Sequence, residues 1–427
     1  MPKLIVEGGY PIDGVCRIGG AKNAVLPILA ACVLTRRRVR LLDCPRLTDV
    51  ENMLRILRLL GCSAERLPAQ AGAPGEGDTL CIDASGACRC ELPEDLSKEL
   101  RSSIFLLGPV LGRFHRAVVT YPGGCEIGNR PIDLHLTGLS ALRAEIREQG
   151  GRIRCDGARL LGASIHLDYP SVGATENILM AATAAEGETV IHNAAREPEI
   201  VDLQNFLNAA GFFVRGAGSS TIVVRGGCEP REVTYRIRPD RIAAGTLLVA
   251  AAITGGRIAL ENVIPDDMAG TLAKLTESGC TIDVRDRTIR LTAPARPREL
   301  KLVETLPHPG FPTDMQAQVF ALCTVADGAS VIVENVFENR FKHAQELSRM
   351  GAISTIKNRT AVIRGVPQLT GATVTAHDLR GGAALVLAGL RAKGVTTVLR
   401  AEHIDRGYER LEATLSALGA HVRREAD

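Results

Sequence analysis

Basic residues recur at places where this chain could bind anions. Several stand at the start of predicted helices, where unpaired backbone N–H groups and partial positive charge already favour negative ligands. If these places face one cleft, they carry more positive charge than folding requires. A substrate bearing both phosphate and carboxylate would match that charge. The helix starts carry Lys22 with Asn23, Arg101, Asp314, and Asp378 with Arg380, and the loops before other helices carry Arg130, Arg340 and Arg406.

Each of these residues also has an ordinary structural interpretation. An Arg taken alone is most often a solvated surface charge or one half of an ion pair. Asp314 could serve as a helix N-cap in FPTDMQ, a role that Thr313 could fill equally well. The recurrence of the basic residues at corresponding places favours a binding site, and Asp314 could fill both roles.

Cys125 lies in the Gly-rich sequence YPGGCEIGNRP, shortly before Arg130. A guanidinium near a thiol in a flexible loop favours a reactive cysteine. Most cysteines in soluble proteins are instead small buried apolar residues. The residues alone leave both interpretations open.

The sequence contains no motif typical of metal or nucleotide-cofactor binding. Cys88 and Cys90 in CRC have the wrong interval for a zinc site, and the His residues form no pair at ligand or catalytic spacing. No Walker lysine motif occurs, and GAPGEG does not match a dinucleotide fingerprint. We therefore expect neither a metal nor a cofactor.

The composition predicts a soluble globular protein with two or three cores, since 45% of its 427 residues are apolar and 23% are charged. A net charge of +3, 3% aromatics and no Trp do not suit nucleic-acid binding. The start of the chain has no signal-peptide pattern, and no apolar run reaches the roughly 18 residues that cross a bilayer. With 12 scattered cysteines, these features indicate a cytoplasmic protein without membrane insertion.

A strand, a short loop and an amphipathic helix closed by Gly recur six times along the chain. The closing residues are Gly61, Gly150, Gly211, Gly279, Gly351 and Gly419, of which the last four are about 70 residues apart. Gly suits the left-handed position after a helix C-terminus, and another strand follows each of these residues. The unit that ends at Gly150 has a longer loop, and we expect its helix to run to that Gly.

The second recurring element is a helix rich in Ala and Leu on all sides. We predict it over residues 22–34, 101–112, 171–187, 241–256, 313–328 and 380–394. A helix that is apolar all round has to be buried all round. Each unit therefore offers one enclosed helix, one half-exposed helix and about four strands. The predicted fold is α/β, with helices enclosed by sheets and six units arranged as two lobes of three.

The lobe boundary is expected near residues 235–242, where a Pro between basic residues follows a completed unit. The N-terminal lobe would hold residues 22–238, including the loop around Cys125. The C-terminal lobe would hold residues 1–21 and 239–427, with the first strand completing it. Residues 68–78 read as an exposed hairpin loop without chemistry.

Long motifs in this sequence resemble those of the bacterial UDP-N-acetylglucosamine 1-carboxyvinyltransferases. They are GGAKNAVLPI, LRSSIFLLGP, PGGCEIGNRPIDLH, AAREPEIVD, PDRI, FPTDMQAQ, FENRF, DLRGGAALVLAG and HIDRGYERLE. The similarity runs from about residue 3 to about residue 422. It implies the enolpyruvyl transferase fold, a two-lobed inside-out α/β barrel with its active site between the lobes.

Carried over residue by residue, the resemblance implies two sets of ligand contacts. Phosphoenolpyruvate would be bound by Lys22, Asn23, Arg130 and Arg406, with Arg340 and Arg380 at its carboxylate and at the intermediate. UDP-N-acetylglucosamine would be contacted by Arg101, Arg130, Pro131, Ile132, Asp133, Leu134, Ser171, Val172, Gly173, Asp314 and Val336.

The resemblance also implies a reaction by addition and elimination, without metal or cofactor. The sugar hydroxyl would add to C2 of the enol phosphate while Cys125 protonates C3, or Cys125 would attack C2 to form an adduct. Asp314 would take or orient the hydroxyl proton, and Lys22 and Arg406 would stabilise the phosphate as it leaves.

Two departures and two alternatives accompany this interpretation. Tyr169 stands where relatives often carry Lys, and Thr48 stands where some carry Lys, so one uridine-diphosphate contact is in doubt. The shikimate-pathway enolpyruvyl transferase shares the fold but lacks the PGGC loop. A non-catalytic nucleotide-sugar-binding relative would be expected to lose Cys125, Asp314 or the arginines, all of which are present here.

Overall fold

The computed structural model describes residues 2–68, 77–121, 128 and 131–426. Internal contacts divide the chain into two units. The C-terminal unit holds residues 2–18, 128 and 239–426, and the N-terminal unit holds the described residues of 19–121 and 131–238. Within the described residues, no helix is long and apolar enough to span a membrane. Most of the predicted hairpin loop at 68–78 lies outside the described residues.

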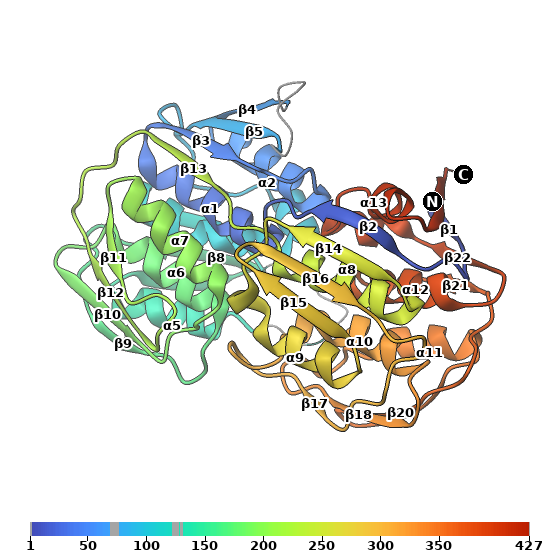
Figure 1. The fold of residues 1–427 in the computed structure, drawn as a ribbon. Helices are drawn as coiled ribbons and strands as arrows, with labels where there is room; N and C mark the ends of the chain where they lie inside the picture. Colours follow the sequence, from blue (N-terminus) through green and yellow to red (C-terminus); the bar gives the residue numbers. More distant parts are fainter. Residues whose placement is uncertain (1, 69–76, 122–127, 129–130, 427) are drawn as a thin grey trace. The chain divides into compact units, whose positions relative to one another are not determined.

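The described strands form six sheets, three in each unit (Figure 1). In the N-terminal unit the strand orders are β13(Val233–Arg236)-β3(Arg38–Leu42)-β5(Thr79–Asp83)-β4(Ser63–Leu67), β6(Arg116–Thr120)-β8(Arg152–Asp156)-β7(Glu145–Gln149) and β11(Phe213–Arg215)-β12(Thr221–Arg225)-β10(Glu188–His192)-β9(Ser164–His166). In the C-terminal unit they are β21(Thr373–Thr375)-β22(Val395–Leu399)-β1(Lys3–Glu7)-β23(His421–Glu425), β15(Thr281–Arg285)-β16(Thr288–Thr292)-β14(Arg257–Glu261)-β2(Asp13–Arg17) and β17(Val303–Glu304)-β18(Ala329–Val333)-β20(Thr360–Arg364)-β19(Ile353–Lys357).

Each four-stranded sheet has the same topology, with three antiparallel strands and one parallel edge strand. The parallel pairs are β13–β3, β9–β10, β2–β14, β17–β18 and β21–β22. The three-stranded sheet keeps a trace of the same edge as an isolated parallel bridge between Glu91 and Val118. This common topology confirms the six repeated units predicted from the sequence.

The first strand completes a sheet made otherwise of C-terminal strands. β1 pairs antiparallel with both β22 and β23, and Figure 1 shows the two chain ends close together at this sheet. The next strand, β2, runs parallel to β14. Residues 3–17 therefore contribute to two sheets of the C-terminal unit.

Three helices that are apolar on all sides pack against one another in each unit, as predicted. In the N-terminal unit they are α1 (Lys22–Thr35), α4 (Leu107–Phe114), which continues the 3-10 helix η1 (Arg101–Leu106), and α6 (Val172–Ala182). In the C-terminal unit they are α8 (Arg241–Thr254), α10 (Gln316–Cys323), preceded by the 3-10 helix η3 (Thr313–Met315), and α12 (Leu379–Arg391). All residues of α10 are buried, and Asn23 is the one exposed residue of α1. Each trio lies within its unit's own hydrophobic core.

The half-exposed helices also form. They are α2 (Thr48–Leu59), α5 (Asp133–Ala141), α7 (Pro198–Ala209), α9 (Ala269–Glu277), α11 (Lys342–Arg349) and α13 (Leu411–Ala417), with the shorter α3 (Glu94–Glu99), η2 (Pro265–Met268) and η4 (Ala401–Arg406) between elements. Five of the six closing glycines, all but Gly150, follow these helices with φ between 91° and 100°. An L side chain is strained there, so Gly is favoured.

The predicted helix end at Gly150 is wrong. Helix α5 ends at Ala141, and Arg143, with a φ of 72°, takes the left-handed position that Gly takes in the other units. Residues 145–149, EIREQ, form strand β7, and Gly150 lies in the turn to β8. Glu, Arg and Gln favour a helix, but pairing of the whole strand with β8 outweighs that preference.

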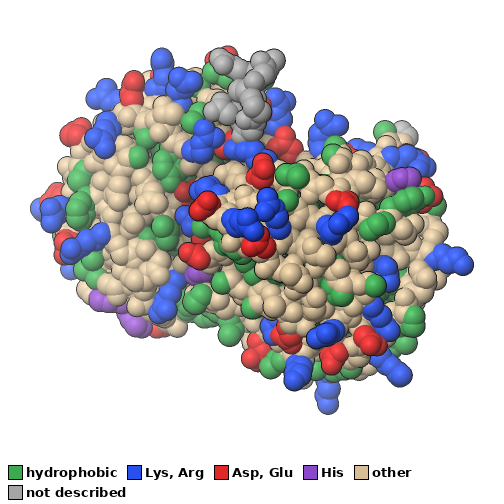
Figure 2. Space-filling view, viewed as in Figure 1, with side chains coloured by type: hydrophobic (Ala, Val, Ile, Leu, Met, Phe, Trp, Pro, Cys, Tyr) green, Lys and Arg blue, Asp and Glu red, His purple; other side chains and the backbone are tan. Residues whose placement is uncertain are grey.

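Charged side chains of both signs are interspersed on the face shown in Figure 2, over both units. Many form exposed ion pairs, such as Arg154 with Asp156 at 2.6 Å and Arg159 with Glu186 at 2.7 Å. Pairs of this kind contribute little to stability because water screens them. Among the described residues, the buried ion pairs include those of Asp314 with Arg340 and Arg380 and that of Lys22 with Asp49.

Candidate active site

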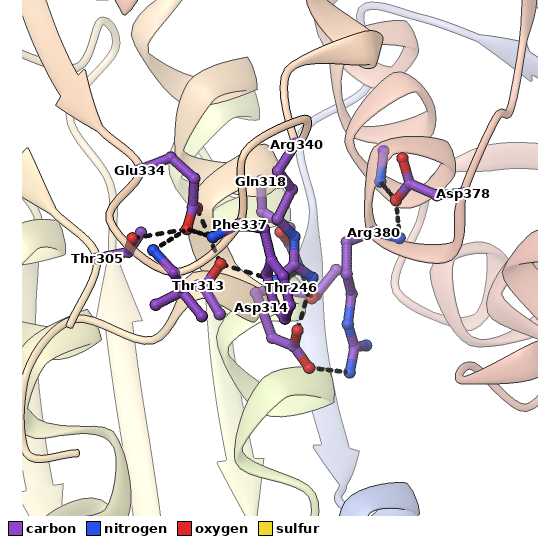
Figure 3. A network of polar contacts seen from close by, with 12 residues as sticks. Thr246, Thr305, Thr313, Asp314, Gln318, Glu334, Phe337, Arg340, Asp378 and Arg380 are labelled. Carbon is purple, nitrogen blue, oxygen red and sulfur yellow. Dashed lines mark hydrogen bonds and ion pairs between the residues drawn. The ribbon is translucent and has the colours of Figure 1, made fainter. Parts of the chain in front are cut away.

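Asp314 is held between two arginine side chains in the C-terminal unit (Figure 3). Its Oδ1 accepts a hydrogen bond from Arg340 Nη2 at 2.6 Å, and its Oδ2 accepts one from Arg380 Nη2 at 3.0 Å. Both arginines are buried, whereas about a quarter of the Asp314 side chain is exposed. The structure thus brings together three residues that lie far apart in the sequence and that were predicted to belong to one site.

The two arginines keep Asp314 ionised. Burial by itself raises the pKa of Asp314, but Arg380 and Arg340 outweigh burial and hold that pKa well below its usual value. Burial lowers the pKa of Arg380, and the neighbouring Asp314 outweighs it, so that pKa is raised. Asp314 and Arg380 are therefore both charged at neutral pH.

The interpretation of Asp314 or Thr313 as a helix cap is wrong. The N-cap of η3 is Pro312, and no side chain caps this turn. The Thr313 hydroxyl instead accepts a hydrogen bond from Arg340 Nη1 at 2.7 Å and donates one to Glu334 at 2.8 Å. Both polar side chains at this helix start are therefore bound to other side chains.

Aromatic and polar side chains support the arginines. The Arg340 guanidinium lies 5.1 Å from the Phe337 ring centroid, and that of Arg380 lies 5.4 Å from the Tyr408 ring centroid. The Tyr408 hydroxyl is 2.8 Å from the Thr246 hydroxyl, and the amide of Gln318 donates to both at 3.1 Å. This network joins the starts of α8 and α10 beneath the ion pairs.

The other predicted residues of the C-terminal unit lie on neighbouring segments. Val336 is half-buried in the loop after β18, and its N–H donates to Glu334 at 2.9 Å. Arg406 is the last residue of η4, which packs on α12, the helix that carries Arg380. We propose that Arg406 and Asp314 belong to one site.

In the N-terminal unit, Lys22 begins α1 and is almost completely buried. Its Nζ lies 2.7 Å from Asp49 Oδ2, and Asp49 is a buried residue of the first turn of α2. Asn23, the next residue, is exposed. The ion pair with Asp49 fixes a buried cation at a helix start.

Asn177 joins three segments that carry predicted nucleotide-sugar contacts. Its Nδ2 donates to Ile104 O at 3.0 Å and lies 2.9 Å from His135 Nδ1, and its Oδ1 accepts from Gly108 N at 2.8 Å. These contacts connect the middle of α6 with η1, which begins at Arg101, with the start of α4 and with the first turn of α5. Because the Asn177 side chain is buried, its amide needs these hydrogen-bond partners in place of water.

The starts of α5 and α6 lie side by side. A Cβ added at Gly173 would lie 3.0 Å from the His135 ring, so a larger residue there would force the ring to shift. Ser171 caps α6, since its Oγ accepts from Ala174 N at 3.4 Å. The predicted residues at the two helix starts are Pro131, Ile132, Asp133 and Leu134 on one side and Ser171, Val172 and Gly173 on the other.

Cys125 and Arg130 lie outside the described residues. Sequence reasoning did not find Glu334, Gln318, Tyr408, Asp49, His135 or Asn177. Two positions carried signals, since Asn177 and Gln318 are polar residues within helices that are mostly apolar. Among the described residues, no group of three or more His, Cys, Asp or Glu side chains could hold a metal ion.

Comparison with known proteins shows the family and the fold of this chain. The family model of EPSP synthase (3-phosphoshikimate 1-carboxyvinyltransferase) matches residues 6–415. Among solved structures, the enolpyruvyl transferase NikO from Streptomyces tendae has a TM-score of 0.87 and 26% identity over 100% of this chain and 99% of that one. EPSP synthase from Acinetobacter baumannii has a TM-score of 0.74 at 20% identity, with all of both chains covered, which shows a common fold.

Fold and family model together define the class of this protein as an enolpyruvyl transferase. Two curated relatives are named UDP-N-acetylglucosamine 1-carboxyvinyltransferase. That of Myxococcus xanthus is 48% identical over all of both chains, and that of Symbiobacterium thermophilum, numbered 1, is 52% identical over 99% of this chain and 95% of its own. The chain belongs to the UDP-N-acetylglucosamine 1-carboxyvinyltransferase family, which confirms the resemblance seen in its motifs.

Proposed function

We propose that this protein transfers the enolpyruvyl group of phosphoenolpyruvate to the 3′-hydroxyl of UDP-N-acetylglucosamine and releases phosphate. This is the first committed step of peptidoglycan precursor synthesis. The names of its relatives support the reaction, and the observation that carries it is the Asp314 carboxylate between two buried arginines. The scattered cysteines support a cytoplasmic location.

The reaction needs a proton donor, a proton acceptor and cations. In the addition, the sugar oxygen bonds to C2 of the enol phosphate, Cys125 gives a proton to C3 and Asp314 takes the hydroxyl proton. In the elimination, C3 loses a proton and phosphate leaves C2. Lys22, Asn23, Arg130 and Arg406 bind the phosphate in this proposal, and Arg340 and Arg380 bind the donor carboxylate and the intermediate.

The low pKa of Asp314 has a consequence for this chemistry. A carboxylate held by two guanidinium groups is ionised but is a weak base. A substrate anion that draws Arg340 or Arg380 toward itself would weaken their hold on Asp314 and raise its pKa. In this proposal, donor binding makes Asp314 a stronger base at the step that needs one.

Phosphate release from phosphoenolpyruvate tests the proposal. The purified protein is assayed with UDP-N-acetylglucosamine and, separately, with shikimate 3-phosphate. We expect release only with the nucleotide sugar. Release only with shikimate 3-phosphate would favour the alternative that the family model's description suggests. No release with either acceptor would favour a non-catalytic relative.

A further inference from the structure

Glu334 is a completely buried carboxylate with four hydrogen-bond donors around it (Figure 3). Its Oε1 accepts from the Thr305 hydroxyl at 2.8 Å and from the N–H groups of Val336 and Phe337 at 2.9 and 3.1 Å. Its Oε2 accepts from the Thr313 hydroxyl at 2.8 Å. One oxygen therefore holds the loop after β18, and the other holds the turn that carries Asp314.

The Thr313 hydroxyl also binds Arg340 and so connects Glu334 to Arg340. A hydroxyl has one hydrogen, and here it points to Glu334. The oxygen lone pairs are then free to accept from Arg340 Nη1 at 2.7 Å, while Arg340 Nη2 binds Asp314 at 2.6 Å. Glu334, Thr313, Arg340 and Asp314 form one chain of hydrogen bonds with a fixed direction.

The neighbouring repeat shows that the fold does not need a carboxylate at this place. Val263 N donates to Arg287 O at 3.0 Å, and Glu334 N donates to Arg359 O at 2.8 Å, so the two residues hold the same position in their sheets. Val263 is buried and apolar.

The sequence Glu-Asn-Val occurs at both places, but in different registers. In the first, Asn262 has a φ of 56° and adds one residue, which leaves Glu261 exposed as the last residue of β14. A buried carboxylate is costly unless its partners compensate for lost water. The function of Glu334 therefore lies in the groups that it binds.

We propose that Glu334 is a positioning residue, which orients Arg340 toward Asp314 through Thr313 and holds the loop that carries Val336. The inference rests on the proposed function, in which Asp314 handles the proton of the acceptor hydroxyl and Val336 contacts the nucleotide sugar. In this proposal, Glu334 itself contacts no reacting atom of either substrate.

Two variants separate the orientation of Arg340 from the positioning of the loop that carries Val336, and a third variant is the control. Glu334→Gln leaves one oxygen acceptor and places an NH2 group where the other oxygen stood, so the loop N–H groups and the Thr313 hydroxyl cannot both keep an acceptor. Thr313→Val keeps the shape of the side chain, leaves the loop contacts of Glu334 Oε1 in place and removes both hydrogen bonds of the hydroxyl, the one to Glu334 Oε2 and the one from Arg340. Glu261→Gln, in the exposed copy of the same tripeptide, is the matched control.

Steady-state rates with both substrates test the proposal. We expect Thr313→Val to lower kcat about tenfold, the scale of one lost hydrogen bond, with less than about a twofold change in KM for UDP-N-acetylglucosamine. Glu334→Gln should lower kcat similarly and also raise that KM. The double variant should have about the kcat of the slower single variant, because both changes break one chain. Glu261→Gln should match the wild type.

Wild-type kcat in Thr313→Val and Glu334→Gln would overturn the proposal, as would a double-variant loss equal to the product of the single losses. If Glu334→Gln does not fold, Thr313→Val decides alone. Crystal structures separate this inference from the proposed function. Should the wild type show no turnover, an unchanged Arg340–Asp314 contact in Thr313→Val would still overturn the positioning role, and a displaced Arg340 would support it.

Discussion

The central helices of the C-terminal unit begin in two different ways. Asp240 and Asp378 cap α8 and α12, and each carboxylate accepts hydrogen bonds from two N–H groups of its own helix. Asp314 stands one residue inside η3 and binds Arg340 and Arg380 instead. The same residue type at similar places thus serves the helix in two cases. In the third, its charge faces the side chains of two arginines.

Removal of one of the two arginines that bind Asp314 should have the largest effect on stability. Arg380→Met keeps most of the side-chain stem but leaves Asp314 with one cationic partner. We expect the free energy of unfolding to fall by about 3 kcal/mol at neutral pH, as for other broken buried ion pairs. Urea denaturation measures the loss. Arg285→Met, which breaks the exposed pair with Asp283, should change stability by no more than about 0.5 kcal/mol.

The pH dependence of the Arg380→Met loss provides a second check. The pKa of Asp314 is depressed in the folded wild type, so its contribution to stability is present above the unfolded pKa near 4 and is lost as pH falls below that value. The difference between the wild type and Arg380→Met should therefore narrow below about pH 4. A constant difference at all pH values would show that the loss comes from packing alone.

His343 should produce the next largest effect. It is buried against Phe320, 4.9 Å between ring centroids, and neither ring nitrogen has a hydrogen-bond partner in the described part of the chain. Burial lowers the pKa of His343 to about 4, although Asp378 opposes this and Arg340 adds to it. The unfolded chain therefore binds a proton at a higher pH than the folded chain, and stability falls as pH drops from about 6.5 toward 4.

Comparison of stability curves tests the His343 prediction. His343→Gln should reduce the slope of unfolding free energy against pH by up to about 1.4 kcal/mol per pH unit within that range. An identical slope in wild type and His343→Gln would contradict a buried neutral imidazole.

The capping role of Asp240 predicts a smaller loss. Asp240→Ala removes the acceptor for the N–H groups of Ile242 and Ala243, which should cost about 1 kcal/mol of stability. Asp240→Asn keeps a capping oxygen and should lose less. Thermal denaturation of both variants measures the difference, and equal losses would mean that the charge of Asp240, rather than its cap, stabilises the unit.

Substitution of Arg143 should have the smallest effect on stability, and this effect should be a stabilisation. It adopts the left-handed conformation that Gly adopts after five other outer helices. Arg143→Gly should stabilise the protein by about 0.5 kcal/mol, because Gly carries no backbone strain in this conformation. The greater conformational freedom of Gly in the unfolded chain offsets part of this gain. Arg143→Ala should give no gain. Stabilisation by Ala as well would show that the guanidinium, and not the backbone, is unfavourable.

Sequence patterns predicted the repeated fold because burial requires apolar residues on all sides of the central helices. The same patterns placed Asp314, Arg340 and Arg380 in one site. They missed β7, whose residues favour a helix but pair with β8. They also missed Glu334, since the tripeptide Glu-Asn-Val occurs twice and only the register of the chain decides which Glu is buried. Such contacts depend on tertiary partners that sequence spacing does not reveal.

Turnover by Asp314→Asn tests the central claim most directly. The variant keeps size and most hydrogen bonding but removes the charge that the two arginines hold. With phosphoenolpyruvate and UDP-N-acetylglucosamine at saturation, we expect phosphate release to fall about a hundredfold or more, the usual scale for a general base, while both ligands still bind. Asp240→Asn, assayed beside it, should stay within about threefold of the wild type. Near-normal turnover in Asp314→Asn, or equal losses in both variants, would contradict the account.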